Sequence, residues 1–388
     1  MNAIKIIRLI CINVLVIDSL RNLPIIANLG SNLFMLYIVA AVIFLIPVAY
    51  LSRRIAEVGL STGAASIYQF TRMELGHRMA KLQEVFLWVY NVLWYPTLIL
   101  FLGSFIAPII KEPINANYLS LFFLIPMLLL SLLPILFSSS VSTVFALIGA
   151  IIPMSILSIY AFVTIFMHPS HSSLSYFMPH LGDLKLSYIP TVFFSLMGIE
   201  IATMHSDLLF SKKSQWNIAL WISVVLIIFL LTGCGLAVWE MGQGHFLGAL
   251  TISLMKVFSF VPVPHFSHLI ILLIALSILA QAVFWMQATA RGIVKAFSGG
   301  VDWLKVRLTV VLQTVITLIA MIGIIKYKSF NSAFIYVSNL SVLFAVFYYM
   351  ILMSSYLKYC HTNKKRKTWG IIGAGGIVVL LITVLMTL

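Results

Sequence analysis

The sequence predicts an all-α polytopic membrane protein with about eleven transmembrane helices. Of its 388 residues, 62% are hydrophobic and only 9% are charged, and the mean hydropathy is +1.10. A soluble protein has about 25% charged residues. The apolar residues also fall into stretches of about 20, the length that a helix needs to cross a bilayer. Composition and spacing therefore agree on the fold class.

The predicted spans follow one another along the whole chain with mostly short connections. They cover roughly residues 5–29, 32–52, 83–110, 118–137, 141–166, 189–210, 216–239, 267–292, 306–326, 332–357 and 369–387. No small-residue cleavage site follows the first stretch, so we expect a span there and not a signal peptide. Residues 246–260 are also apolar but, at about 15 residues, short for a span. We expect them to form a short helix over the outer face.

Basic residues divide unequally between the two sides of this topology. With the N-terminus in the cytoplasm, about 18 of the 24 Lys and Arg residues lie on the cytoplasmic side and about five on the other. Such a bias is typical of a multi-pass plasma membrane protein and predicts a cytoplasmic N-terminus. It also accounts for the net charge of +14 without a nucleic-acid partner.

Nothing in the sequence predicts an enzyme, a cofactor or a metal centre. The three cysteines are far apart, and the usual catalytic and phosphate-binding motifs are missing. Two His-x-x-His pairs, His168 with His171 and His265 with His268, fall in predicted outer loops. They could bind a metal or sense acid pH, but no Cys or acid completes a ligand set. We therefore interpret them as solvated loop residues.

Two ionisable residues, Asp18 and Arg21, interrupt the first predicted span just before Pro24. A charge in hydrocarbon costs about 2.5–3.5 kcal/mol on insertion scales, so such residues are candidates for a functional site. The polar Ser19 and Asn22 lie beside them. We therefore expect a broken helix around a polar site. The alternative is a structural ion pair, because Asp18 and Arg21 stand at helical spacing.

The sixth predicted span repeats this pattern, with the breaker Gly198 beside the acid Glu200. Corresponding interruptions in two halves of a chain indicate a transporter binding site. Broken helices present free N–H groups to a carboxylate and free carbonyls to an ammonium, which suits a zwitterion such as an amino acid. Glu200 could accept the ammonium or carry a coupling proton, since low dielectric favours the neutral carboxyl. Alternatively, Glu200 joins Asp18 and Arg21 in a structural network.

Polar and aromatic residues in other spans add candidates to this site. Asn91 and Trp94 precede a potential kink at Pro96 in the third span, and Trp285 lies in the eighth. They could line a substrate chamber or serve only in helix packing. His205, nearer the cytoplasmic end of the sixth span, is a candidate gate residue.

Four groups of residues resemble the amino acid–polyamine–organocation superfamily, and most of all the glutamate/GABA antiporter branch with its bacterial amino acid permease relatives. They are residues 18–24 with 44–48, the loop 56–68, residues 91–97 and residues 195–200. Trp285 also matches. The resemblance covers about residues 10–357, and the stretch in the sixth span is the most specific.

The resemblance implies a leucine-transporter-type fold within a single transporter domain, 1–388. Residues 1–166 and 189–357 would be two inverted repeats of five helices, with residues 369–387 a peripheral helix. It also implies a secondary transporter of amino acids or related amines in the bacterial inner membrane. Transport would be by exchange with alternating access, with the bilayer, the substrate and protons as partners.

The resemblance also assigns roles to residues. Substrate binding would involve residues of spans 1, 3, 6 and 8, namely Asp18, Ser19, Arg21, Asn22, Asn91, Trp94, Phe194, Ser195, Gly198 and Trp285. Gating or proton coupling would involve Glu200 and His205. The loops after spans 6, 8 and 10 depart from the family pattern. A second interpretation is therefore a degenerate permease that acts as an amino acid sensor or scaffold without transporting.

Overall fold

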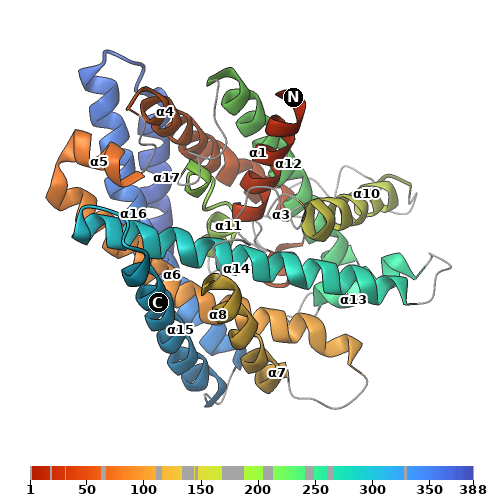
Figure 1. The fold of residues 1–388 in the computed structure, drawn as a ribbon. Coiled ribbons are helices and arrows are strands. Elements are labelled where there is room, and N and C mark those ends of the chain that lie inside the picture. The colour runs from red at the N-terminus through yellow and green to blue at the C-terminus, as the bar shows by residue number, and fades with distance from the viewer. Residues whose placement is uncertain are drawn as a thin grey trace.

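The computed structural model is a bundle of helices, and none of the residues it describes lies in a strand (Figure 1). The structure describes residues 2–17, 20–30, 32–62, 67–110, 116–132, 144, 147–167, 188–203, 213–240, 249–259, 265–326 and 330–387. This arrangement follows from the composition, because a helix satisfies all of its backbone hydrogen bonds internally when it lies in lipid.

Helices of the first half include several short segments. In chain order they are α1 (Asn2–Ile17), η1 (Leu20–Asn22), α2 (Leu23–Ile26), η2 (Ala27–Leu29), α3 (Asn32–Ala40), η3 (Ala41–Leu45), α4 (Ile46–Thr62), α5 (Ile67–Leu75), α6 (His77–Ile106), η4 (Ala107–Ile109), α7 (Ala116–Phe122), α8 (Leu124–Leu132), η6 (Leu147–Ile151) and α10 (Ile152–Met167).

Most helices of the second half are long. They are α11 (Ile189–Phe194), α12 (Lys213–Glu240), α13 (Ala249–Phe258), α14 (Phe266–Ser298), α15 (Trp303–Lys326), α16 (Phe330–Thr362) and α17 (Thr368–Leu385). The termini of these helices agree with the predicted spans to within several residues, except where the chain forms a break.

Eight helices within the described part of the chain are long and apolar enough to cross a membrane. They correspond to eight of the predicted spans. The remaining three, 5–29, 118–137 and 189–210, are divided into shorter helices. Interruptions in the first and sixth spans were expected. The first span is an α-helix up to Ile17 and a 3-10 helix from Leu20, and the α-helix of the sixth span ends at Phe194. The division of the fourth span at Phe123, between α7 and α8, was not expected.

The centre of the bundle is formed by α6, α14 and α16. Helix α6 packs against both of the others, and α14 crosses the middle of the view in Figure 1. Of the 18 most apolar consecutive residues, 72% are buried in α6 and in α14, but only 33% in α15. Helix α15 instead exposes a stripe of large apolar side chains at helical spacing, including Leu304, Leu308 and Ile319. Such a stripe suits contact with lipid, so α15 is peripheral.

Residues 246–260 contain the short helix that the sequence predicted. Helix α13 has 10 residues and packs against α12 and α14. The Thr251 hydroxyl donates a hydrogen bond of 2.6 Å to the backbone carbonyl of Phe105, at the end of α6. A helix of this length is too short to cross the bilayer.

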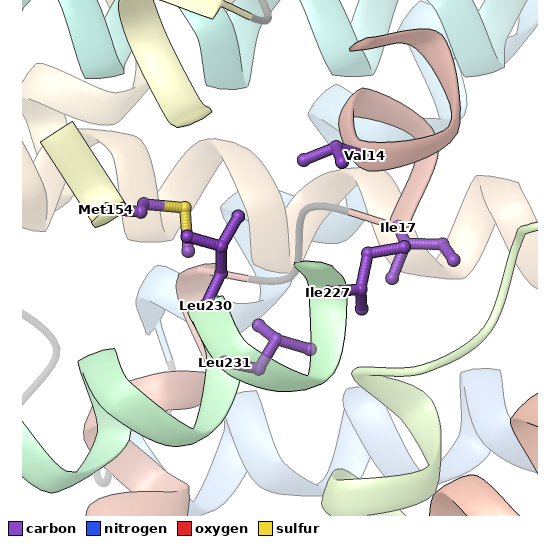
Figure 2. A pocket seen from close by; sticks show the side chains of 6 residues that line it. All are labelled: Val14, Ile17, Met154, Ile227, Leu230 and Leu231. Atoms are coloured by element: carbon purple, nitrogen blue, oxygen red, sulfur yellow. The ribbon is translucent and has the colours of Figure 1, made fainter. Parts of the chain in front are cut away.

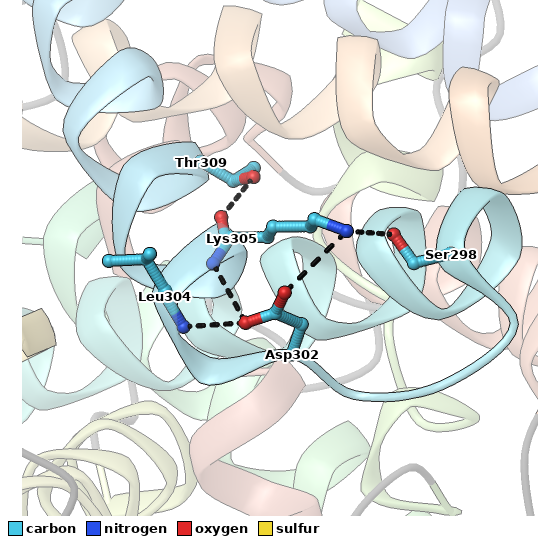
Figure 3. Close-up of polar contacts among 5 residues, drawn as sticks. All are labelled: Ser298, Asp302, Leu304, Lys305 and Thr309. Carbon is cyan, nitrogen blue, oxygen red and sulfur yellow. Dashed lines mark hydrogen bonds and ion pairs between the residues drawn. The ribbon is translucent and has the colours of Figure 1, made fainter.

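A compact turn joins α14 to α15. Helix α14 ends at Gly299, which has a φ of 73°. Asp302 caps the next helix, because its Oδ1 accepts hydrogen bonds from the backbone N–H groups of Leu304 at 3.0 Å and Lys305 at 3.5 Å (Figure 3). The Lys305 ammonium lies 3.5 Å from Asp302 Oδ2 and donates to Ser298 Oγ at 3.4 Å. These contacts stabilise the turn between α14 and α15.

Two neighbouring glycines test the packing of α17. A Cβ atom at Gly376 would lie 2.3 Å from the backbone oxygen of Ile43, whereas one at Gly375 would meet open space. We expect Gly376→Ala to destabilise the protein by about 1–3 kcal/mol through overpacking. Gly375→Ala should be neutral or stabilising, because alanine favours helix by about 1 kcal/mol. Thermal midpoints of the two variants in detergent test this difference, and equal midpoints would contradict the packing.

Candidate functional site

The first helix break is stabilised from α14. Helix α1 extends to Ile17, and the chain forms a 3-10 helix, η1, from Leu20. The Trp285 indole N–H donates to the Val16 carbonyl at 2.9 Å, and the Gln281 amide donates to the same oxygen at 3.3 Å. Two side chains one turn apart on α14 therefore donate to the same backbone carbonyl near the end of α1.

The second break is stabilised from α16. Helix α11 ends at Phe194, and the Ser195 hydroxyl turns back to the Val192 carbonyl at 2.6 Å. The chain then reaches Gly198, which has a φ of 117°. The N–H of Gly198 donates to the Tyr349 hydroxyl at 3.1 Å. A tyrosine of α16 thus satisfies a backbone group that the broken helix leaves free.

Glu200 lies at the same turn and is fully buried. Its Oε1 accepts hydrogen bonds from the hydroxyls of Tyr349 at 2.9 Å and Tyr348 at 3.2 Å. Its Oε2 is buried without a hydrogen-bond partner. Tyr349 therefore connects the backbone of the break to the carboxyl group, which has one acceptor position left.

The two breaks meet at Gly198. A Cβ atom at this position would lie 2.6 Å from Cζ2 of Trp285 and 3.2 Å from the Val16 oxygen. Both the backbone conformation and the available space therefore require glycine here. Val16 and Gly198 belong to different halves of the chain, and the ring of Trp285 contacts both breaks.

Aromatic rings enclose this meeting point. Tyr90 lies edge-on to Phe194 at 5.8 Å between ring centroids and to Trp285 at 6.0 Å, and Trp94 lies 5.9 Å from Trp285. Each of these four side chains is at most 5% exposed. The structure thus brings together three predicted site residues, Trp94, Phe194 and Trp285, in a closed arrangement.

Three further predicted residues, Asn91, Asn22 and Ser195, are also fully buried. Asn91 follows Tyr90 on α6, and its side-chain N–H group donates to the Leu87 carbonyl at 2.8 Å. Its Oδ1 is buried without a hydrogen-bond partner. Asn22 is fully buried at the end of η1. The Ser195 hydroxyl, besides its contact with α11, lies 3.1 Å from the Tyr37 hydroxyl of α3.

Several predicted residues cannot be placed in the site. Asp18, Ser19 and His205 lie outside the described residues, and only the backbone of Arg21, in η1, is described. The proposed network of Asp18, Arg21 and Glu200 therefore stays a prediction.

The histidine pairs add no metal site within the described part of the chain. His265 and His268 have ring centroids 5.5 Å apart, but no group of three possible ligands forms among the described residues. His168 and His171 lie outside those residues.

Sequence reasoning missed Gln281, Tyr348 and Tyr349. The adjacent tyrosines of α16 had a usable signal, because a hydroxyl in the middle of a span needs a hydrogen-bond partner. Gln281 lies one turn before Trp285 and shares its face of α14. Its role follows only from the position of the Val16 carbonyl.

A small pocket lies beside the end of α1, and Figure 2 shows its lining. Its side chains come from α1, α10 and α12, and all are apolar: Val14, Ile17, Met154, Ile227, Leu230 and Leu231. A pocket of this kind offers no hydrogen bond to a charged solute. We therefore place the candidate site at the paired breaks.

Two helix breaks that meet inside a bundle of membrane helices define a secondary transporter of the leucine-transporter type. The chain belongs to the amino acid permease family, because the family matches residues 4–388. It is thus an integral membrane transporter and not an enzyme.

Relatives agree with this assignment. The chain is 28% identical over 398 residues to an uncharacterized transporter of Legionella pneumophila, across 97% of this chain and 85% of that protein. It is 23% identical over 270 residues to a probable agmatine/putrescine antiporter of Lactococcus lactis, across 68% of this chain and 57% of the relative.

Solved structures support the fold. Structures of a manganese transporter of Eremococcus coleocola, determined for two mutants, each superpose with a TM-score of 0.57 at 14% identity. The match covers 99% of this chain and 85% of that protein. The leucine-transporter-type fold is therefore shared although few residues are.

The two adjacent tyrosines of α16 offer a matched test of the second break. Tyr349→Phe removes the hydrogen bonds to both Gly198 and Glu200, whereas Tyr348→Phe removes only the longer bond to Glu200. A buried group left without its partner costs about 1–3 kcal/mol. We expect Tyr349→Phe to lower the thermal midpoint in detergent more than Tyr348→Phe does. The reverse order would show that Tyr349 does not stabilise the break.

Proposed function

We propose that this protein exchanges an amino acid, or the amine derived from one, across the bacterial inner membrane by alternating access, with its N-terminus in the cytoplasm. The observation that supports this most directly is the meeting of the two helix breaks at Gly198 and Trp285. The antiporter relative supports exchange in particular. The basic loops of the predicted topology support the orientation.

The chemistry of the breaks suits a solute that carries an ammonium group. Helix ends direct carbonyls toward a cation and N–H groups toward an anion. The free Oε2 of Glu200 and the free Oδ1 of Asn91 are additional buried acceptors. An amino acid would use both kinds of helix end, whereas an amine would use the acceptors alone.

Access to this site requires side chains to move. The ring of Tyr90 contacts those of Phe194 and Trp285, and all three are almost fully buried. A solute can reach the breaks only when one side of this aromatic cluster opens. In the proposed cycle, the cluster separates from one side of the membrane at a time, which gives alternating access.

Counterflow in proteoliposomes tests the proposed exchange. Vesicles containing the purified protein would be loaded with agmatine, putrescine or a neutral, acidic or basic amino acid, and uptake of the labelled compound would be measured. We expect one chemical group to give uptake that depends on the internal load. Ligand stabilisation of the protein without any counterflow would instead support the sensor interpretation. Neither stabilisation nor counterflow with any compound would contradict both.

Replacing Glu200 tests its proposed role with protons. Glu200→Gln preserves the shape and the acceptor used by Tyr348 and Tyr349, but removes the titratable group. We expect its exchange rate to vary less with pH than that of the wild type. Glu240→Gln, at the exposed end of α12, is the matched control and should retain the normal pH profile. A normal profile for Glu200→Gln would exclude Glu200 as the proton-binding group.

A further inference from the structure

A second buried acid lies in α6, away from the helix breaks. Glu84 is 1% exposed and precedes Asn91 by two helical turns, or about 10 Å along the helix axis. Residues at this spacing share one face of a helix. Glu84 is therefore on the face of α6 that carries Asn91, displaced toward the predicted cytoplasmic side.

The carboxyl group of Glu84 has no hydrogen-bond partner at either oxygen. Both polar atoms of the neighbouring Gln83, which is fully buried, also have none. Each such atom costs about 1–3 kcal/mol, and an ionised carboxylate left in this state costs more. The surroundings of Glu84 in this conformation therefore suit the neutral acid far better than the carboxylate.

Helix α14 packs directly against the carboxyl group of Glu84. A Cβ atom at Gly292 would clash with Oε2 of Glu84, so the carboxyl group in this position lies directly against the Gly292 backbone. Gly292 follows Trp285 by two turns and shares its face of α14. Two of the helices that form the aromatic cluster, α6 and α14, therefore also meet at Glu84.

Charged and titratable groups approach Glu84 from the helices around it. Lys295 lies on α14 three residues after Gly292, and Lys81 precedes Glu84 by one turn on α6. Tyr68 and Tyr348 are titratable groups on α5 and α16, two helices that pack against α6. Tyr348 donates a hydrogen bond to Glu200.

We propose that Glu84 is a second proton-binding carboxyl group, protonated while α6 and α14 are closed over it and ionised opposite Lys295 when they separate. On opening, the acid O–H bond breaks, the proton passes to water on the open side, and the carboxylate remains. On closing, a proton from that water returns to it. A role of this proton in transport rests on the proposed exchange function, whereas proton binding by itself does not.

Infrared spectroscopy of the purified protein in detergent tests the proton directly. We expect the wild type to show a carboxylic acid C=O band at neutral pH that is lost in Glu84→Gln. The exposed control Glu240→Gln should retain this band. The glutamine has the shape of the neutral acid, so the variant should keep a thermal midpoint near that of the wild type. Identical spectra for wild type and Glu84→Gln would overturn the proposal.

A second variant keeps the acid and changes its surroundings. Gly292→Ala places a methyl group against Oε2, so the same C=O band should shift in frequency. An unchanged band would overturn the assignment even if Glu84→Gln failed to fold.

Transport in proteoliposomes then separates the two proposals. We expect Glu84→Gln to exchange substrate at equal pH on both sides and to lose the stimulation that a pH gradient gives the wild type. Stimulation equal to the wild type would exclude a transport role for the Glu84 proton. If the wild type does not transport at all, the exchange function fails while the infrared result still decides whether Glu84 binds a proton.

Discussion

The rest of this structure depends on one constraint, which is that a helix broken inside a membrane must find new partners for its backbone groups. Water is not available there, and each group left alone costs several kcal/mol. In this protein the partners are side chains of distant helices. Trp285 and Gln281 of α14 serve the Val16 carbonyl, and Tyr349 of α16 serves the Gly198 N–H group. The hydrogen bonds to these backbone groups therefore constrain how α14 and α16 pack around the breaks.

The aromatic contacts around the breaks close the site, but they are weak enough to separate. Aromatic rings bury large apolar areas, yet their edge-to-face contacts contribute only about 0.5–1.5 kcal/mol each beyond that burial. The cluster of Tyr90, Phe194 and Trp285 can thus separate without breaking a helix. Glu200 is bonded to Tyr348 and Tyr349 of α16, whereas Glu84 lies on α6 against Gly292 of α14. Helix α6 packs against both α14 and α16, so its movement would change the surroundings of both acids.

Much of the site could be predicted, because its breakers and charges stand out against apolar sequence. The interruption after Ile17, the glycine at 198 and the acid beside it are local features, and Trp285 was recognised from a family resemblance. Tyr349, Gln281 and Glu84 were not predicted. Each is unremarkable in its own helix, and its significance comes from the group that it faces. The division of the fourth span at Phe123 did have a local signal, because Pro126 in the first turn of α8 provides no N–H group for the Phe122 carbonyl.

By itself, the sequence determined that this protein crosses the membrane many times, and that its first and sixth spans are interrupted. Hydrophobic length and helix breakers act over a few turns of one segment, so both can be recognised locally. Only the tertiary structure decided which side chains satisfy the interruptions. The contact of Gly198 with Trp285 and Val16 joins residues that are far apart in the chain. The physical reason is that a free backbone group in a membrane specifies the need for a partner, whereas helix packing selects which residue supplies it.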